Sequence, residues 1–216
     1  MPKLSLENKT DILAAIFLTG LITANLLGNK ITTLLGISVS VAIFTYPLTF
    51  LMTDIIAEVH GKKKANSLIL AGFVSLLILL GVTYLSIVLP ANSRYPHNES
   101  YVTVFSSSVR IILASLIAFI LSQIHDIWSF HFWKEKTKGK WLWLRNNAST
   151  VVSQFIDTVI FMFIAFYQVA PMFDFAFMWH MIIPYYLFKI AFALIDTPLV
   201  YLGVNWLKKS SQEQTK

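Results

Sequence analysis

Residues 62–90, KKKANSLILAGFVSLLILLGVTYLSIVLP, decide the fold class. Three lysines precede an apolar run that contains no charged residue between Ala65 and Pro90. A helix advances ~1.5 Å per residue, so about 20 apolar residues span the ~30 Å hydrocarbon core of a bilayer. The run is therefore predicted to cross a membrane, with the three lysines at one surface.

The rest of the chain has the same apolar character. Of its 216 residues, 56% are hydrophobic and only 13% are charged, whereas soluble domains carry about 25% charged residues. Too little polar sequence remains for a separate soluble domain, so we predict an all-α integral membrane protein with one domain at residues 11–207. Six transmembrane helices are expected, at Asp11–Asn29, Val39–Glu58, Ala65–Pro90, Val104–Trp133, Ala148–Gln168 and Phe177–Leu207.

Three features of these spans depart from a straight crossing helix. Pro47 lies inside the second span and is expected to kink it, because proline removes a helix hydrogen bond and clashes with the preceding turn. Residues 28–38 are expected to form a helix end followed by a short extended or re-entrant piece at the outer surface. The fourth and sixth spans are longer than a bilayer requires and are expected to tilt or protrude.

The positive charges are distributed in a way that indicates orientation. Of the 17 lysine and arginine residues, 13 lie at the N terminus, after the second span, after the fourth span or in the tail. Cytoplasmic loops carry such an excess, so both termini are predicted to be cytoplasmic, with residues 1–10 and 208–216 as short ends. The net charge of +6 is explained in this way rather than by nucleic-acid binding.

Two opposite charges are predicted to meet near the middle of the membrane. Asp157 lies 12 residues after Arg145, and Lys189 lies 12 residues after Phe177. Each is therefore about 18 Å into the ~30 Å core, from opposite sides. One interpretation is an ion pair that only fixes helix packing. We prefer a second, the polar centre of a substrate site, because ionisable residues within membranes commonly mark pathways.

Other polar and aromatic residues are candidates for the same site. Gln154 shares a helix face with Asp157, and Tyr185 shares one with Lys189. Asp54 is expected to face a cavity, whereas Glu58 fits a cavity or the cytoplasmic interface equally well. The full set of substrate-binding candidates is Asn25, Phe50, Asp54, Glu58, Asp126, Gln154, Asp157, Tyr185, Lys189 and Asp196.

No motif indicates an enzyme, a metal site or a cofactor. The chain has no cysteine, which excludes disulfides and thiolate ligands, and it contains no phosphate-binding loop, nucleophile elbow or zinc-hydrolase signature. His125 and His131 flank Asp126 but match no helical ligand spacing, so they are interpreted as interfacial residues. Arg110 is expected either to extend outward or to bind an anionic or carbonyl group.

Two polar motifs stand out within the spans, Pro47–Asn66 with Asp54 and Glu58, and Trp143–Thr158 with Gln154 and Asp157. Together with Asn25–Lys30 and Gln123–Phe130, they resemble the bacterial queuosine precursor transporter family, formerly the putative vitamin uptake transporters. Asn66 departs from the family pattern, in which arginine is expected. The resemblance covers nearly the whole chain from Asn25 to the end of the sixth span.

The resemblance implies import of the 7-deazaguanines preQ0 or preQ1 across the bacterial inner membrane for tRNA modification. A central site is then expected between spans one, two, five and six. A carboxylate can accept both N–H donors of a guanine-like edge, an amide or lysine can donate to its carbonyl, and aromatic faces can stack on the ring. The expected partners are this small molecule and the lipid bilayer, with no nucleic acid, and a homodimer is left open.

Two alternatives remain beside this hypothesis. The first is a substrate-binding membrane subunit of an ATPase-driven vitamin-type importer, which would require a separate ATPase. The second is a non-transporting membrane scaffold, whose buried acidic residues would tolerate substitution.

Overall fold

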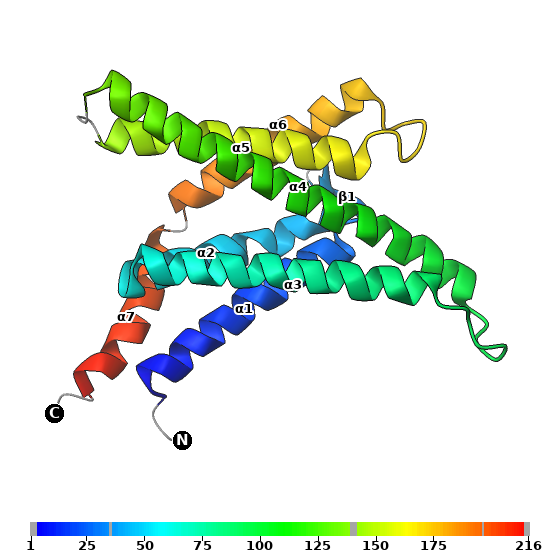
Figure 1. The fold of residues 1–216 in the computed structure, drawn as a ribbon, viewed down its shortest axis with the longest axis horizontal. Helices are drawn as coiled ribbons and strands as arrows, with labels where there is room; N and C mark the ends of the chain where they lie inside the picture. Colours follow the sequence, from blue (N-terminus) through cyan, green and yellow to red (C-terminus); the bar gives the residue numbers. More distant parts are fainter. Residues whose placement is uncertain (1–3, 35, 139–141, 196, 214–216) are drawn as a thin grey trace.

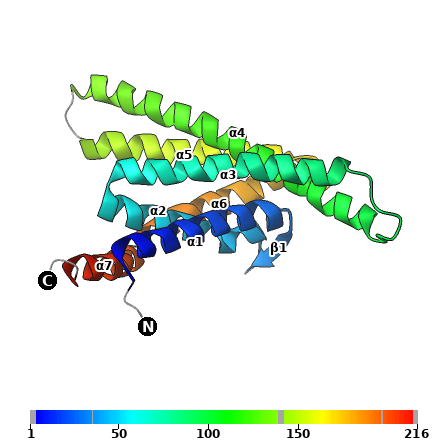
Figure 2. The ribbon, with the colours of Figure 1, turned by 60° about the horizontal axis from the view of Figure 1, so that its bottom comes forward.

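The helices are arranged in two layers. The computed structural model describes residues 4–34, 36–138, 142–195 and 197–213. One layer contains α1 (Leu6–Leu27), α2 (Tyr46–His60), α3 (Lys62–Val88) and α7 (Thr197–Glu213), and the other contains α4 (Asn98–Lys136), α5 (Leu142–Phe166) and α6 (Phe175–Ile195) (Figure 1). In both ribbon views α4 and α5 run side by side (Figures 1 and 2).

The helices have the length and composition of membrane spans. Within the described residues, five helical stretches are long and apolar enough to cross a bilayer: Leu6–Leu27, Val41–His60, Lys62–Val88, Asn98–His125 and Phe175–Phe192. A further apolar helix, Val151–Phe166 in α5, is shorter. The chain is therefore a multi-pass α-helical membrane protein.

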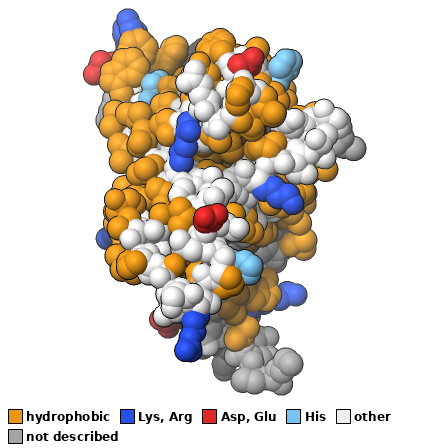
Figure 3. Space-filling model, turned by 90° about the vertical axis from the view of Figure 1, so that its right-hand side faces the viewer, with side chains coloured by type: hydrophobic (Ala, Val, Ile, Leu, Met, Phe, Trp, Pro, Cys, Tyr) orange, Lys and Arg blue, Asp and Glu red, His pale blue; other side chains and the backbone are white. Residues whose placement is uncertain are grey.

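Different helix ends and connections lie at the two ends of the bundle. The start of α1, the α2–α3 turn and the end of α7 lie at one end, and the α3–α4 and α5–α6 connections lie at the opposite end (Figure 1). On the face that carries these two connections, charged side chains stand singly among hydrophobic and uncharged ones (Figure 3). The helix α4, with 39 residues, is about twice as long as the ~20 residues that a crossing needs.

A β-hairpin precedes the second span. The strands β1 (Ile31–Leu34) and β2 (Ile37–Ser40) pair antiparallel, with Ile31 opposite Ser40. Gly36 takes a positive φ of 81° at the turn, a conformation that glycine adopts without a steric penalty. The Ser40 hydroxyl donates a hydrogen bond to the Gly28 carbonyl at the end of α1. The extended alternative predicted for residues 28–38 is therefore confirmed.

The expected kink at Pro47 is wrong. The chain forms a short 3₁₀ helix, η1 (Val41–Phe44), and α2 begins only at Tyr46, so Pro47 lies in its first turn. Proline is favoured there, because the first turn of a helix has no intrahelical partner for the missing N–H. Pro47 therefore marks a helix start.

The sixth predicted span, Phe177–Leu207, is also corrected, because it is two helices. The helix α6 ends at Ile195 and α7 begins at Thr197, with Pro198 in its first turn. Proline cannot continue a helix and disfavours helical geometry in the residue before it. Through Val204 and Leu207, α7 packs on a cluster of apolar residues from α1, α2 and α3.

Apolar packing holds each layer together and leaves room between them. One core joins α4, α5 and α6 with β2 and includes Ile111, Met162 and Ile182, which are all at most 2% exposed. The other joins α1, α2 and α3 to α7. A smaller cluster with Leu76 and Ile112 connects α3 to α4. The space between the layers holds the cavity described next.

Candidate functional site

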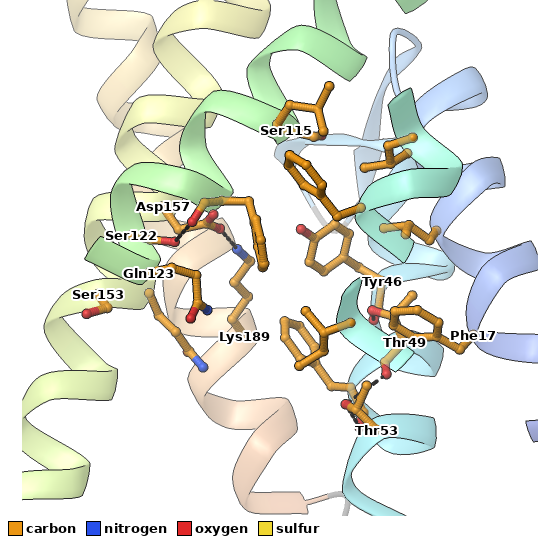
Figure 4. Close-up of a pocket in the computed structure, with 18 residues that line it drawn as sticks. Phe17, Tyr46, Thr49, Thr53, Ser115, Ser122, Gln123, Ser153, Asp157 and Lys189 are labelled. Carbon is orange, nitrogen blue, oxygen red and sulfur yellow. Dashed lines mark hydrogen bonds and ion pairs between the residues drawn. The ribbon is translucent and has the colours of Figure 1, made fainter. Parts of the chain in front are cut away.

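A cavity of about 280 Å³ lies between the two layers. Polar side chains of α4, α5 and α6 form one wall, and side chains of α1 and α2 face them from the other side (Figure 4). Its polar lining consists of Thr49, Thr53, Ser115, Ser122, Gln123, Ser153, Gln154, Asp157 and Lys189, and its aromatic lining of Phe17, Tyr46, Phe50, Phe73 and Phe119. The site therefore combines flat apolar faces with hydrogen-bonding groups.

The charged centre of the cavity is an ion pair between α5 and α6. Lys189 Nζ lies 3.1 Å from Asp157 Oδ2 and also donates to Thr158 Oγ1 at 3.2 Å. The side chain of Lys189 is 7% exposed and that of Asp157 is 22% exposed. Their predicted proximity is confirmed. The cost of burying two charges is offset here by their mutual attraction and by the additional hydroxyl.

Aromatic rings complete the surroundings of the lysine. Its Nζ lies 5.0 Å from the ring centroid of Tyr46 and 5.4 Å from that of Tyr185. Both distances fall within the range of about 6 Å in which a ring face attracts a cation. Tyr185 is 3% exposed and packs beneath Lys189, one helical turn away on α6. Lys189 is thus held on several sides at once.

Helical periodicity explains why these side chains meet. Gln154, Asp157 and Thr158 stand three and four residues apart, so they share one face of α5. Gln154 and Asp157 line the cavity, and Thr158 accepts the bond from Lys189. The polar face predicted for this span is therefore the face that borders the cavity.

The hydroxyl groups of the lining were not predicted from the sequence. Thr49 and Thr53 of α2 and Ser122 of α4 donate to carbonyls of their own helices, at 2.7, 2.8 and 3.0 Å. Their oxygens keep lone pairs that can accept from a ligand. The four-residue spacing of Thr49 and Thr53 was a weak signal, because serine and threonine often bond back to the helix in this way.

The wall from α4 was also missing from the predicted site. The site was expected between spans one, two, five and six, yet α4 contributes Ser115, Ser122 and Gln123 and α3 contributes Phe73. Ser115 and Ser122 are seven residues apart, which is two helical turns, so they lie on one face. In the sequence, Gln123 was identified only as the first residue of the Gln123–Phe130 motif.

Asn25 supports the site from outside it. It is 2% exposed, and its Oδ1 accepts a 2.7 Å hydrogen bond from Ser115, which lines the cavity. Near it, Ser108 donates to the Leu26 carbonyl at 2.9 Å, and the Asn29 amide donates to a carbonyl of α4 at 3.2 Å. These three bonds tie the last turns of α1 to α4.

Of the remaining candidates, Phe50 borders the cavity, whereas Asp54 and Glu58 do not. Phe50 lines the cavity and contacts the Tyr46 ring at a centroid distance of 5.4 Å. Asp54 and Glu58 are exposed on α2 and do not border the cavity. The side chain of Asp126, in α4, and the whole of Asp196 lie outside the described residues.

Arg110 contacts carbonyl groups, which was one of its two predicted roles. Its Nε donates to the Ile164 carbonyl at 2.6 Å and its Nη2 to the Tyr167 carbonyl at 2.7 Å. These carbonyls belong to the C-terminal end of α5, where backbone acceptors lack helical partners. A cation is also favoured at that end of a helix. Arg110 therefore joins α4 to the end of α5.

The described residues bring no three histidine, aspartate or glutamate side chains together as metal ligands. The side chain of His125 forms a hydrogen bond with Ser153, with 2.9 Å between Nδ1 and Oγ. For the recognition of a ligand, the cavity offers two amides, several hydroxyls, one ion pair and aromatic faces.

Comparisons with known proteins agree with a transport role. A model of the family described as "Putative vitamin uptake transporter" matches residues 40–203. The chain is 34% identical over 182 residues to a "Probable queuosine precursor transporter" of Bacillus subtilis (strain 168), covering 83% of this chain and 78% of that protein. It is 26% identical over 195 residues to the "Queuosine precursor transporter" of Escherichia coli (strain K12), covering 90% and 86% of the two chains. No solved structure matches the chain.

Proposed function

Because the chain belongs to the putative vitamin uptake transporter family, we propose that it imports queuosine precursors, which are 7-deazaguanine bases, across the bacterial inner membrane. The cavity between the two layers is the proposed binding site. The observation that carries this proposal is the cavity lining, which offers aromatic faces together with the Asp157 carboxylate and two glutamine amides. Relatives whose names specify this cargo align with most of the chain.

The size and chemistry of the cavity suit a small flat base. Its volume of about 280 Å³ is close to the lower limit of small-molecule pockets, about 300 Å³. Asp157 is 22% exposed and can accept from two adjacent N–H donors, while Gln123 or Gln154 can donate to a ring carbonyl. Stacking on Tyr46 or Phe50 would add about 1–3 kcal/mol.

We propose six spans with both termini in the cytoplasm. The helix α5 is added to the five spanning stretches described above, because its 25 residues exceed the ~20 that a span needs. The start of α1 and the end of α7 lie at the same end of the bundle (Figure 1). That end also holds Lys62, Lys63 and Lys64, as expected of a cytoplasmic surface.

Transport then requires the two layers to move relative to each other around the cavity. Pro47, at the junction of η1 and α2, is the proposed hinge. The cavity lies where helices of both layers meet, which is the usual place for a substrate site in transporters that work by alternating access.

The test is uptake of labelled preQ0 and preQ1 by cells that lack both their own importer and the synthesis pathway. We expect accumulation with the wild type and a loss of more than tenfold with Asp157→Asn. The matched control is Asp11→Asn, the same change at an exposed position outside the cavity, which should leave uptake unchanged. A well-expressed wild type that accumulates neither base would contradict the proposal, and a fully active Asp157→Asn would favour a purely structural ion pair.

A further inference from the structure

We propose that the Asp157–Lys189 pair makes this cavity select an uncharged base over a base that carries an alkylammonium group, with Lys189 as the specificity-determining residue. The inference rests on the proposed function, because it concerns which 7-deazaguanine the same cavity accepts. The two precursors differ at one substituent, a neutral nitrile in preQ0 and a protonated aminomethyl group in preQ1. The two precursors therefore share one ring system but differ in net charge.

The cavity offers hydrogen bonds at zero net charge. Among the lining residues that the structure describes, Asp157 and Lys189 alone are charged at neutral pH. They lie 3.1 Å apart, so their charges offset each other. The other polar groups of the lining are the hydroxyls of threonine and serine and the amides of Gln123 and Gln154. These groups recognise donors and acceptors of a neutral base without adding charge.

The negative charge that would stabilise a ligand cation is already offset by Lys189, although the carboxylate keeps lone pairs for uncharged N–H donors. The Lys189 ammonium contacts the Asp157 carboxylate and the ring face of Tyr46 (Figure 4). It also donates to the Thr158 hydroxyl and lies over the ring of Tyr185. A second ammonium in this cavity would lose its hydration without gaining a counter-charge. It would also repel Lys189 in surroundings where charges are weakly screened.

Displacement of the lysine does not remove this penalty. The Lys189 side chain is 7% exposed, and it approaches from α6 in the interior of the bundle (Figure 4). If a ligand cation took its place beside Asp157, the lysine charge would stay buried without its carboxylate. Such an uncompensated charge is strongly unfavourable in a membrane protein. A neutral substituent avoids both costs.

Equilibrium binding to the purified wild-type protein tests the inference. With labelled preQ0 bound, unlabelled preQ1 should compete at least tenfold more weakly than unlabelled preQ0. In Lys189→Met the carboxylate loses its cation and the cavity keeps a net negative charge, so preQ1 should bind at least as tightly as preQ0. Lys189→Arg keeps the charge and is the matched control, in which the preference for preQ0 should remain. The double variant Asp157→Asn with Lys189→Met restores neutrality. It should bind both bases more weakly, because the carboxylate that accepts their N–H donors is lost, and it should restore the preference for preQ0.

The outcomes separate the inference from the proposed function. If the wild type binds both bases within threefold of each other, or binds preQ1 more tightly, the inference is overturned while the proposed function stands. If Lys189→Met binds but keeps the wild-type preference, charge at this position does not set specificity. If the wild type binds neither base, the proposed function fails and the inference fails with it. Should Lys189→Met not fold, the wild-type ratio alone decides.

Discussion

Breaking the Asp157–Lys189 pair should cost stability in a way that depends on which charge is left behind. Asp157→Asn leaves the Lys189 ammonium, which is 7% exposed, with only a hydroxyl and two ring faces. Removing one partner of a buried pair costs about 3–5 kcal/mol, so about 3–4 kcal/mol is expected. Lys189→Met leaves a carboxylate that is 22% exposed to the cavity. Water can reach it, so its cost should be smaller, about 2–3 kcal/mol.

The double variant, Asp157→Asn with Lys189→Met, removes both charges and should cost less than either single change. Replacing a whole buried pair by uncharged groups is often close to neutral, so a cost of about 1 kcal/mol is expected. The coupling energy between the two positions is then about 4–6 kcal/mol, which is above the usual range of about 0.5–3 kcal/mol for residues in contact. Reversible unfolding in mixed detergent micelles, followed by circular dichroism, measures each free energy of unfolding.

The matched control for this cycle combines Asp157→Asn with Lys9→Met. Lys9 is buried to the same degree, 7% exposed, but it lies over the Trp206 ring in the contact between α1 and α7. The two changes share no partner, so their costs should add within about 0.5 kcal/mol. Additive costs for Asp157 and Lys189 themselves would refute the reasoning, because they would show that the two charges do not stabilise each other in the folded protein.

Three further predictions use other contacts. A Cβ at Gly72 would come within 2.9 Å of a phenylalanine ring of α1, whereas at Gly81 it would meet nothing within 4 Å. Gly72→Leu should therefore lower the free energy of unfolding by about 1–3 kcal/mol through overpacking, and Gly81→Leu on the same helix should be neutral. Arg110→Met should lower the free energy of unfolding by about 2–3 kcal/mol, because two carbonyls at the end of α5 lose their charged donor. Arg110→Lys should lower it by less. Equal losses in an unfolding titration would argue against a bidentate contact. Because the chain lacks cysteine, a Leu26→Cys, Ser108→Cys double variant can be cross-linked specifically. If the end of α1 must separate from α4 during transport, the cross-link should stop uptake without stopping binding.

Helix rise and periodicity correctly predicted which charged and polar side chains meet beside the cavity. Counting residues inward from the span ends placed Asp157 and Lys189 at the same depth, and they are in contact. The depth calculation works because helix rise per residue is nearly constant. The same reasoning placed Gln154 on the face of Asp157, and that face borders the cavity.

Where the prediction failed, the local chain was not a continuous helix. Pro47 lies in the first turn of α2 instead of kinking it, and the last predicted span contains two helices, α6 and α7. Hydrophobic length does not distinguish one long helix from two helices joined at a proline, because both are equally apolar. Asp54 was expected to face a cavity because of that kink, and with the kink absent it lies on the exposed side of α2.

The span Lys62–Val88 has one feature that follows from its length and composition and another that depends on packing. Its length and composition alone predicted a spanning helix, and α3 is that helix, because the bilayer thickness sets a length that any apolar run must meet. Which face of α3 would border the cavity was decided only by the packing of the two layers, which brings Phe73 and Leu76 to the lining. The sequence could not show this, because both faces of the helix are equally apolar and a membrane removes the contrast between buried and exposed residues.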